Sequence, residues 1–336
     1  MPVSRRDLRK LVCKLGVDAR RGEQRSALAG LVGLAVEEER NPGTNAIAGA
    51  GAIPVLVQLL GSGMAADLQA PVGTTLLLIG RIADNQVAIA AAGAVPRLLQ
   101  LLRPGSPAAA HEIALSLLAM LAGNAEVAVI IGSAGAIPPL VQLLGPGSSA
   151  DIQKKAAETL GSLAVNAENA AIVAAAGAIP ALVQLLGPGS SALLQEVTAR
   201  ALAYLASNAE NAATIAFWGA IPPLVQLLGP GSKALVQQNA AAVLAGLAMH
   251  ADTRVAIASA GAIPPLVQLL GARFSAEVFI QENATGALGC LASMPEYATM
   301  IAAAGAIPAL EQLLVPGVNA KVKKNKQVLS AATGLD

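Results

Sequence analysis

The sequence predicts an all-α solenoid, and three observations support that fold class. The tetrapeptide GA(I/V)P recurs at intervals of 42 residues, with a final interval of 44. Hydrophobic residues make up 54% of the chain but aromatic residues only 2%, which suits close helix packing by Ala and Leu. Gly and Pro break the apolar pattern at the same places in each period, as in stacked repeats. The corner glycines are Gly51, Gly93, Gly135, Gly177, Gly219, Gly261 and Gly305.

The unit that begins at Asn166 shows how one repeat is built. Asn166 is a favourable N-cap for a short first helix, AENAAIVAAA, and Gly177 ends that helix in the left-handed conformation. Pro180 lies near the start of a second helix, where the apolar residues of Ile179–Leu186 fall on one stripe. GPGSS ends it, and we expect a third, longer helix from about Ala192 to Ala206.

Both ends of the chain depart from this pattern. Residues 1–50 read as a partial N-terminal capping unit with the start of the first full repeat, and residues 51–315 as tandem repeats of 42–44 residues. Residues 316–336 predict a polar C-terminal capping helix, because a solenoid has to end without exposing its core. All three parts are expected to form one continuous domain. We interpret the lysine-rich KVKKNK as the polar face of that cap rather than as a nuclear localisation signal.

Charge and composition exclude several classes of partner and location. The net charge of +1 disfavours nucleic acid as a partner, and Gly and Pro interrupt every stretch that approaches membrane-spanning length. Cys13 and Cys290 have no metal-binding spacing and are predicted to be reduced core residues. The first residues do not resemble a signal peptide. We therefore expect a protein of the cytoplasm, or of cytoplasm and nucleus, that is not secreted and does not insert into membranes.

Catalytic and cofactor motifs are absent from the sequence. His111 and His250 are the only histidines, and neither has a Cys or a carboxylate at metal-ligand spacing. The Gly-rich pairs separate helices and follow no strand, so they predict no nucleotide site. We predict that the protein is not an enzyme and has no catalytic, cofactor-binding or metal-binding residues.

The repeated unit itself resembles a known family. NAENAAIVAAAGAIPALVQLLGPGSSALLQEVTARALAYLAS is similar to the armadillo repeat, and the resemblance covers nearly the whole chain. HEAT repeats are the nearest alternative, but the short first helix and the GAIP corner favour armadillo. The resemblance implies a right-handed α-solenoid (superhelix) of about seven three-helix repeats with partial capping units at both ends. It also implies that the third helices line a concave groove that binds proteins or extended peptides.

Peptide-binding members of that family, such as importin-α, place a Trp and, four residues later, a peptide-clamping Asn on the third helix. The matching Trp positions hold Thr74, Ser116, Glu158, Arg200, Ala242 and Gly286. The matching Asn positions hold Gly33, Leu78, Met120, Ser162, Tyr204, Gly246 and Cys290. Because neither residue type is present, nuclear-import activity is disfavoured.

Two sets of side chains are candidates for binding a protein. The first comprises polar residues expected on the groove, among which Arg and Tyr are types enriched at interface hot spots: Lys155, Glu158, Ser162, Arg200, Tyr204, Asn239 and Asn283. The second is a possible edge of aromatic residues, for which local packing is the alternative: Phe217, Trp218, Phe274 and Phe279.

These features favour a non-enzymatic scaffold or adaptor that binds a partner protein, of unidentified nature, in the groove. Alternatives are a substrate-recognition module associated with a ubiquitin ligase, as in the U-box ligases whose repeats resemble this chain, and a peptide adaptor of the import type. A carrier of an apolar ligand near Leu78 and Met120, and an array that acts as a mechanical spacer, are further alternatives.

Overall fold

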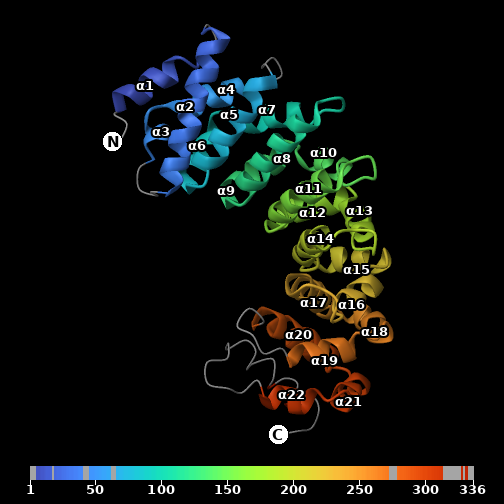
Figure 1. Cartoon of the computed structure of the whole chain (residues 1–336). Helices are drawn as coiled ribbons and strands as arrows, with labels where there is room; N and C mark the ends of the chain where they lie inside the picture. The colour runs from blue at the N-terminus through green and yellow to red at the C-terminus, as the bar shows by residue number, and fades with distance from the viewer. Residues whose placement is uncertain are drawn as a thin grey trace. The chain divides into compact units, whose positions relative to one another are not determined.

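The protein is all-helical, as predicted. The computed structural model describes residues 5–16, 19–40, 45–61, 66–271, 278–312, 327 and 330–331, and within these ranges there is no β-strand. The chain divides into two compact units, unit 1 (Met1–Ile172) and unit 2 (Val173–Asp336). In each unit short and long helices alternate regularly, so each is a length of α-solenoid (Figure 1).

Unit 1 begins with a pair of helices and continues in triplets. The long helices α2, α5, α8 and α11 pack against one another in that order (Figure 1). The helices are α1 (Arg5–Cys13), α2 (Arg21–Arg40), α3 (Ala46–Gly49), α4 (Ala52–Leu59), α5 (Ala66–Ile79), α6 (Ala83–Ala91), α7 (Ala94–Leu101), α8 (Ala108–Ala122), α9 (Ala125–Ser133), α10 (Ile137–Gln142) and α11 (Ala150–Leu163), followed by α12 (Ala167–Ala175), which crosses into unit 2.

Unit 2 repeats the same order of short, short and long helices. Its long helices α14, α17 and α20 pack in succession (Figure 1). The helices are α13 (Ala178–Leu185), α14 (Ala192–Leu205), α15 (Ala209–Phe217), α16 (Ile221–Leu227), α17 (Ala234–Ala248), α18 (Ala251–Ser259), α19 (Ile263–Leu270), α20 (Val278–Leu291), α21 (Pro295–Ala303) and α22 (Ala306–Gln312).

The predicted helix boundaries are confirmed where the signals are local. Asn166 Oδ1 accepts a hydrogen bond of 3.0 Å from the backbone N–H of Asn169, as an N-cap does. Gly177 has φ of +80°, a value that only glycine adopts without strain, and the first helix ends before it. The third helix runs over Ala192–Leu205, within one residue of the expected end. Caps and glycines therefore set the length of each helix in the repeat.

A glutamine in the third helix holds the end of the second helix within the same repeat. The amide Nε2 of Gln195 donates to the carbonyl oxygens of Leu186 and Gly187, at 3.2 and 3.0 Å. Gln153 and Gln237 do the same one repeat earlier and one repeat later. Carbonyl groups at a helix end have no partner within the helix, so these amides satisfy them. At the corresponding position of an earlier repeat, His111 Nε2 lies 3.4 Å from the carbonyl oxygen of Arg103.

The prediction that both cysteines are core residues was wrong. Cys13 is exposed because α1 buries Leu8 and Val12 on its opposite face, while Cys290 is half-buried. The division into capping units and one continuous domain stays a prediction. Most of residues 316–336, the KVKKNK segment included, lie outside the described residues.

Candidate functional site

Three candidate residues of unit 1 share one face of α11. Lys155, Glu158 and Ser162 are spaced at i, i+3 and i+7 and are all half-buried. Lys155 Nζ donates a hydrogen bond to Ser116 Oγ on α8, the preceding third helix. The ammonium group thus crosses from one third helix to the next, and the face is polar where α8 and α11 meet.

In unit 2, Arg200 and Tyr204 lie one turn apart on α14. Tyr204 is 41% exposed, although it belongs to a helix whose other large residues are mostly buried. Arg200 is half-buried and takes part in an interaction within the protein. Tyr and Arg are both among the residue types enriched at interface hot spots.

The remaining two candidates of this face, Asn239 and Asn283, join neighbouring third helices. Asn239 Nδ2 donates to the backbone oxygen of Glu196 at 3.1 Å, and Asn283 Nδ2 donates to that of Gln238 at 3.2 Å. They occupy the position in the repeat that Lys155 occupies in unit 1. Sequence reasoning missed this role, because the acceptor lies more than 40 residues away in the chain. One amide donor of each is therefore engaged inside the protein.

The second candidate set is exposed at the residues that the structure describes. Phe217 is 84% exposed and Trp218 50%, and their rings meet edge to face with centroids 5.9 Å apart. Phe279, on α20, is 60% exposed, whereas Phe274 lies outside the described residues. At the positions of Phe217 and Trp218 the other repeats have only the small residues Ala, Ser or Gly. Such exposure argues against local packing as the reason for the two rings.

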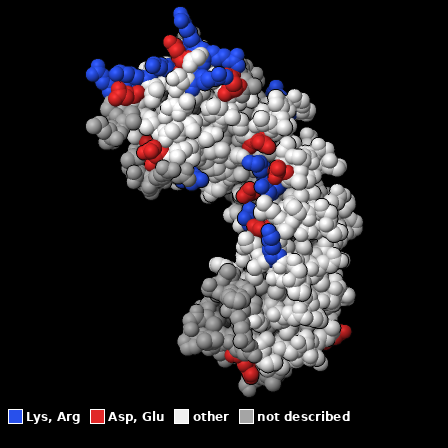
Figure 2. Space-filling model, viewed as in Figure 1, with Lys and Arg blue, Asp and Glu red and all other residues white. Residues whose placement is uncertain are grey.

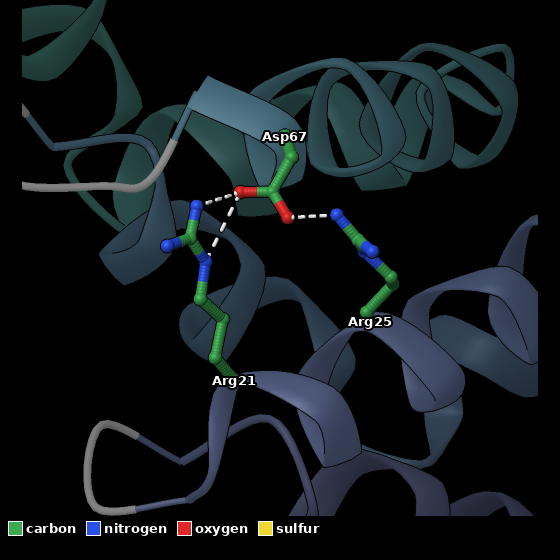
Figure 3. A network of polar contacts seen from close by, with 3 residues as sticks. All are labelled: Arg21, Arg25 and Asp67. Atoms are coloured by element: carbon green, nitrogen blue, oxygen red, sulfur yellow. Dashed lines mark hydrogen bonds and ion pairs between the residues drawn. The ribbon is translucent and has the colours of Figure 1, made fainter.

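A carboxylate held between two guanidinium groups joins α2 to α5 in unit 1 (Figure 3). Arg21 donates to Asp67 Oδ1 through Nη2 and, at 3.2 Å, through Nε, and Arg25 Nη2 donates to Oδ2. The hydrogen bond from Arg21 lowers the pKa of Asp67 most, partial burial opposes it, and Arg25 lowers it further. No motif in the sequence pointed to this network, since its members lie 42 and 46 residues apart.

Metal-ligating side chains are not brought together in the described part of the chain. No cluster of three or more His, Cys, Asp or Glu side chains there is placed to hold a metal ion. Burial raises the pKa of the Cys290 thiol, and the positive charge of Arg254 only partly opposes it. The thiol is therefore protonated at neutral pH and is a poor nucleophile.

Within the described residues, no single helix is both long and apolar enough to cross a membrane. Two pairs of helices, α12 with α13 and α18 with α19, pass the length and composition criteria only when each sharply bent pair is taken together.

Comparisons with known proteins agree with the repeat pattern. Residues 124–165, 166–207 and 250–293 match the family model Armadillo/beta-catenin-like repeat, while no curated protein matches the chain significantly. An engineered protein of known structure is 30% identical with a TM-score of 0.84, over 97% of this chain and 78% of its own. A designed armadillo repeat protein is 31% identical with a TM-score of 0.65, over 71% of this chain and 99% of its own. Another designed armadillo repeat protein, in complex with the peptide (KR)4, is 31% identical with a TM-score of 0.62, over 71% of this chain and 99% of its own.

Proposed function

Since the chain belongs to the armadillo repeat family, we propose that it is a non-enzymatic scaffold that binds a partner protein, or an extended segment of one, along its third helices. The observation that carries the proposal is the exposed Tyr204 ring, one turn from Arg200 on α14. Packed helices supply this surface already folded before binding, so the loss of conformational entropy on binding is small. We also propose that the protein works in the cytoplasm.

The chemistry of the third helices favours a partner segment of mixed polarity. The designed relative binds a peptide made of Lys and Arg. Here α11 of unit 1 presents Lys155 together with Glu158, and α14 of unit 2 presents Arg200, so a purely basic peptide would meet a like charge on either unit. The Asn and Trp positions of the import adaptors hold other residues, which disfavours that mode. A substrate-recognition role in a ubiquitin ligase is compatible with the same surface and differs only in the partner.

A second surface is proposed at Phe217 and Trp218. Exposed rings are costly to keep in water and are enriched in interface cores, and unit 2 carries two in contact at one corner. A partner that covers them would add apolar area to the polar contacts of α14. Phe279 is a weaker candidate because its ring contacts no other aromatic ring among the described residues.

The test begins by identifying partners through proximity labelling with the full chain in living cells. Affinity for each purified partner is then measured with Tyr204→Ala, Arg200→Ala and Trp218→Ala. We expect Tyr204→Ala to weaken binding about tenfold or more, as interface hot spots do. Glu210→Ala serves as the matched control, because Glu210 is an exposed residue of the first helix α15.

Two outcomes would contradict the proposal. If all three substitutions leave the affinity for every partner unchanged, the third helices and the aromatic corner are not the binding surface. If the purified chain itself transfers ubiquitin in a reconstituted assay, the scaffold function is replaced by an enzymatic one.

A further inference from the structure

The N-terminal end of unit 1 carries most of the positive charge of that unit. Residues 5–25 contain eight Lys and Arg against three Asp and Glu, although the whole chain has a net charge of only +1. Figure 2 shows the Lys and Arg side chains gathered over the N-terminal helices of unit 1. We call the exposed basic side chains of this region the N-terminal basic face: Arg6, Arg9, Lys10, Lys14, Arg20, Arg21 and Arg25.

Some of these cations already have an acidic partner, and others do not. Lys10 Nζ lies 3.3 Å from Asp7 Oδ1, and Arg21 and Arg25 share Asp67. The remaining four make no ion pair with any residue that the structure describes: Arg6, Arg9, Lys14 and Arg20. Like charges gathered on one surface repel one another, and a bound anion relieves that repulsion. This face is therefore predisposed to bind negative charge.

The packing of α1 limits what kind of anion fits. Leu8, Val12 and Leu15 lie on one side of this segment and are 2%, 8% and 0% exposed. Because that apolar side is buried against the protein, α1 has no apolar face left to insert into a lipid bilayer. All six aromatic residues lie between residues 204 and 297, so no ring is present in this region for stacking on nucleic acid bases.

The structure itself shows a carboxylate bound on this face. Asp67 is held by Arg21 through two nitrogens and by Arg25 through one (Figure 3). A planar guanidinium group matches the geometry of a carboxylate, and five of the seven cations of the face are arginines. Arg21 and Arg25 remain largely exposed, at 65% and 66%, so the pair lies open to the solvent.

From these observations we propose that the N-terminal basic face binds an acidic segment of a protein, a run of Asp and Glu residues. The carboxylates contact Arg6, Arg9, Lys14 and Arg20, while Asp67 competes with the incoming segment for Arg21 and Arg25. This surface is separate in sequence from the third-helix residues of the proposed function, so either proposal stands without the other.

The test uses the full chain and a fluorescently labelled oligoglutamate peptide, with anisotropy as the readout. We expect the double variant Arg9→Glu/Lys14→Glu to bind about tenfold more weakly than wild type at low salt. The matched control Arg103→Glu/Lys233→Glu makes the same change in net charge at exposed positions elsewhere and is expected to bind like wild type. Circular dichroism confirms that both variants are folded.

A second variant tests the competition. Asp67→Asn releases Arg21 and Arg25 and is expected to tighten peptide binding about threefold, whereas added salt weakens binding in all variants. The proposal is overturned if the control loses as much affinity as the double variant, or if Asp67→Asn weakens binding. It is equally overturned if an oligoglutamine peptide binds as well. Tighter binding of duplex DNA or of phosphatidylserine vesicles at the same salt concentration would replace the acidic segment with another partner.

Discussion

The two units join their third helices by different means. In unit 2, α17 and α20 are each tied to the preceding third helix by an asparagine amide that donates to a backbone oxygen. In unit 1, α2 and α5 are joined by the Asp67 network, and α8 and α11 by Lys155 and Ser116. Between α5 and α8 the missing side chain of Gly73 makes room for Ile113.

The difference shows that the repeat pattern determines where the helices lie, whereas the contacts between successive third helices depend on residues that differ from repeat to repeat. Unit 1 uses charged groups at two of its joints, and it also carries exposed cations that take part in none of them. Unit 2 uses neutral amides, and only six Lys, Arg, Asp or Glu residues occur between 173 and 271. The two units therefore offer surfaces of different chemistry, an ionic one and a neutral one with exposed rings.

The close packing of Gly73 in α5 against Ile113 in α8 predicts the largest effect of a substitution on stability. A Cβ at position 73 would lie 2.6 Å from Ile113 Cγ2, and the β-branched Ile is stiff within a helix. Gly73→Ala is therefore expected to lower the free energy of unfolding by about 1–3 kcal/mol, as overpacking does. Urea denaturation measures the change.

Gly33→Ala is the matched control for this substitution. Gly33 lies in α2, is exposed and has no atom within 4 Å of the position of an added Cβ. The same change there is expected to raise stability by up to about 1 kcal/mol, because Ala is the better helix former. Should the two variants behave alike, close packing does not hold α5 against α8.

The amide joint in unit 2 predicts an intermediate effect. Asn239→Ala removes the hydrogen bond to Glu196 and is expected to cost about 1 kcal/mol in the free energy of unfolding. Asn239→Val introduces the residue found at this position in the preceding repeat, Val197. A valine variant as stable as wild type would show that packing, and not the amide, joins α14 to α17.

The charged joint between α8 and α11 predicts a smaller effect. Lys155→Met keeps the length of the side chain but removes the contact with Ser116, and is expected to cost about 0.5 kcal/mol or less. Lys154→Met is the control on the same helix, since Lys154 only approaches Asp151 at 3.9 Å. A loss at Lys155 as large as at Asn239 would remove the distinction between the two kinds of joint.

The Asp67 network predicts the smallest effect, with a characteristic pH dependence. The pKa of Asp67 is lowered in the folded protein, so its contribution is fully present above the unfolded value and is lost as pH falls through the lowered one. The difference in Tm between wild type and Asp67→Asn is therefore expected to be constant above about pH 5 and to vanish in strong acid. Scanning calorimetry at several pH values checks this, and a difference that grew on acidification would refute it.

The sequence was most informative where the determining signals are local. The cap at Asn166, the turn at Gly177 and the helix Ala192–Leu205 followed from neighbouring residues alone. The roles of Asn239 and Gly73 depend on atoms about 40 residues away, which periodicity does not reveal. Phe217 and Trp218 were noticed because they interrupt a run of small residues, but only the structure shows that both rings face solvent. The exposure of Cys13 was missed because α1 is amphipathic and Cys13 lies outside its buried side, which is formed by Leu8 and Val12.

The glutamine contacts of the third helices have a consequence for how such a chain changes length. Gln195 holds its second helix through Leu186 and Gly187, residues of the same repeat, and Gln153 and Gln237 do likewise. If one whole repeat is deleted or duplicated, each of these glutamines keeps the two backbone oxygens to which it donates, because they belong to the same repeat. Gain or loss of repeats then changes the number of third helices in the chain, while the pairing of the second and third helices within each remaining repeat is preserved.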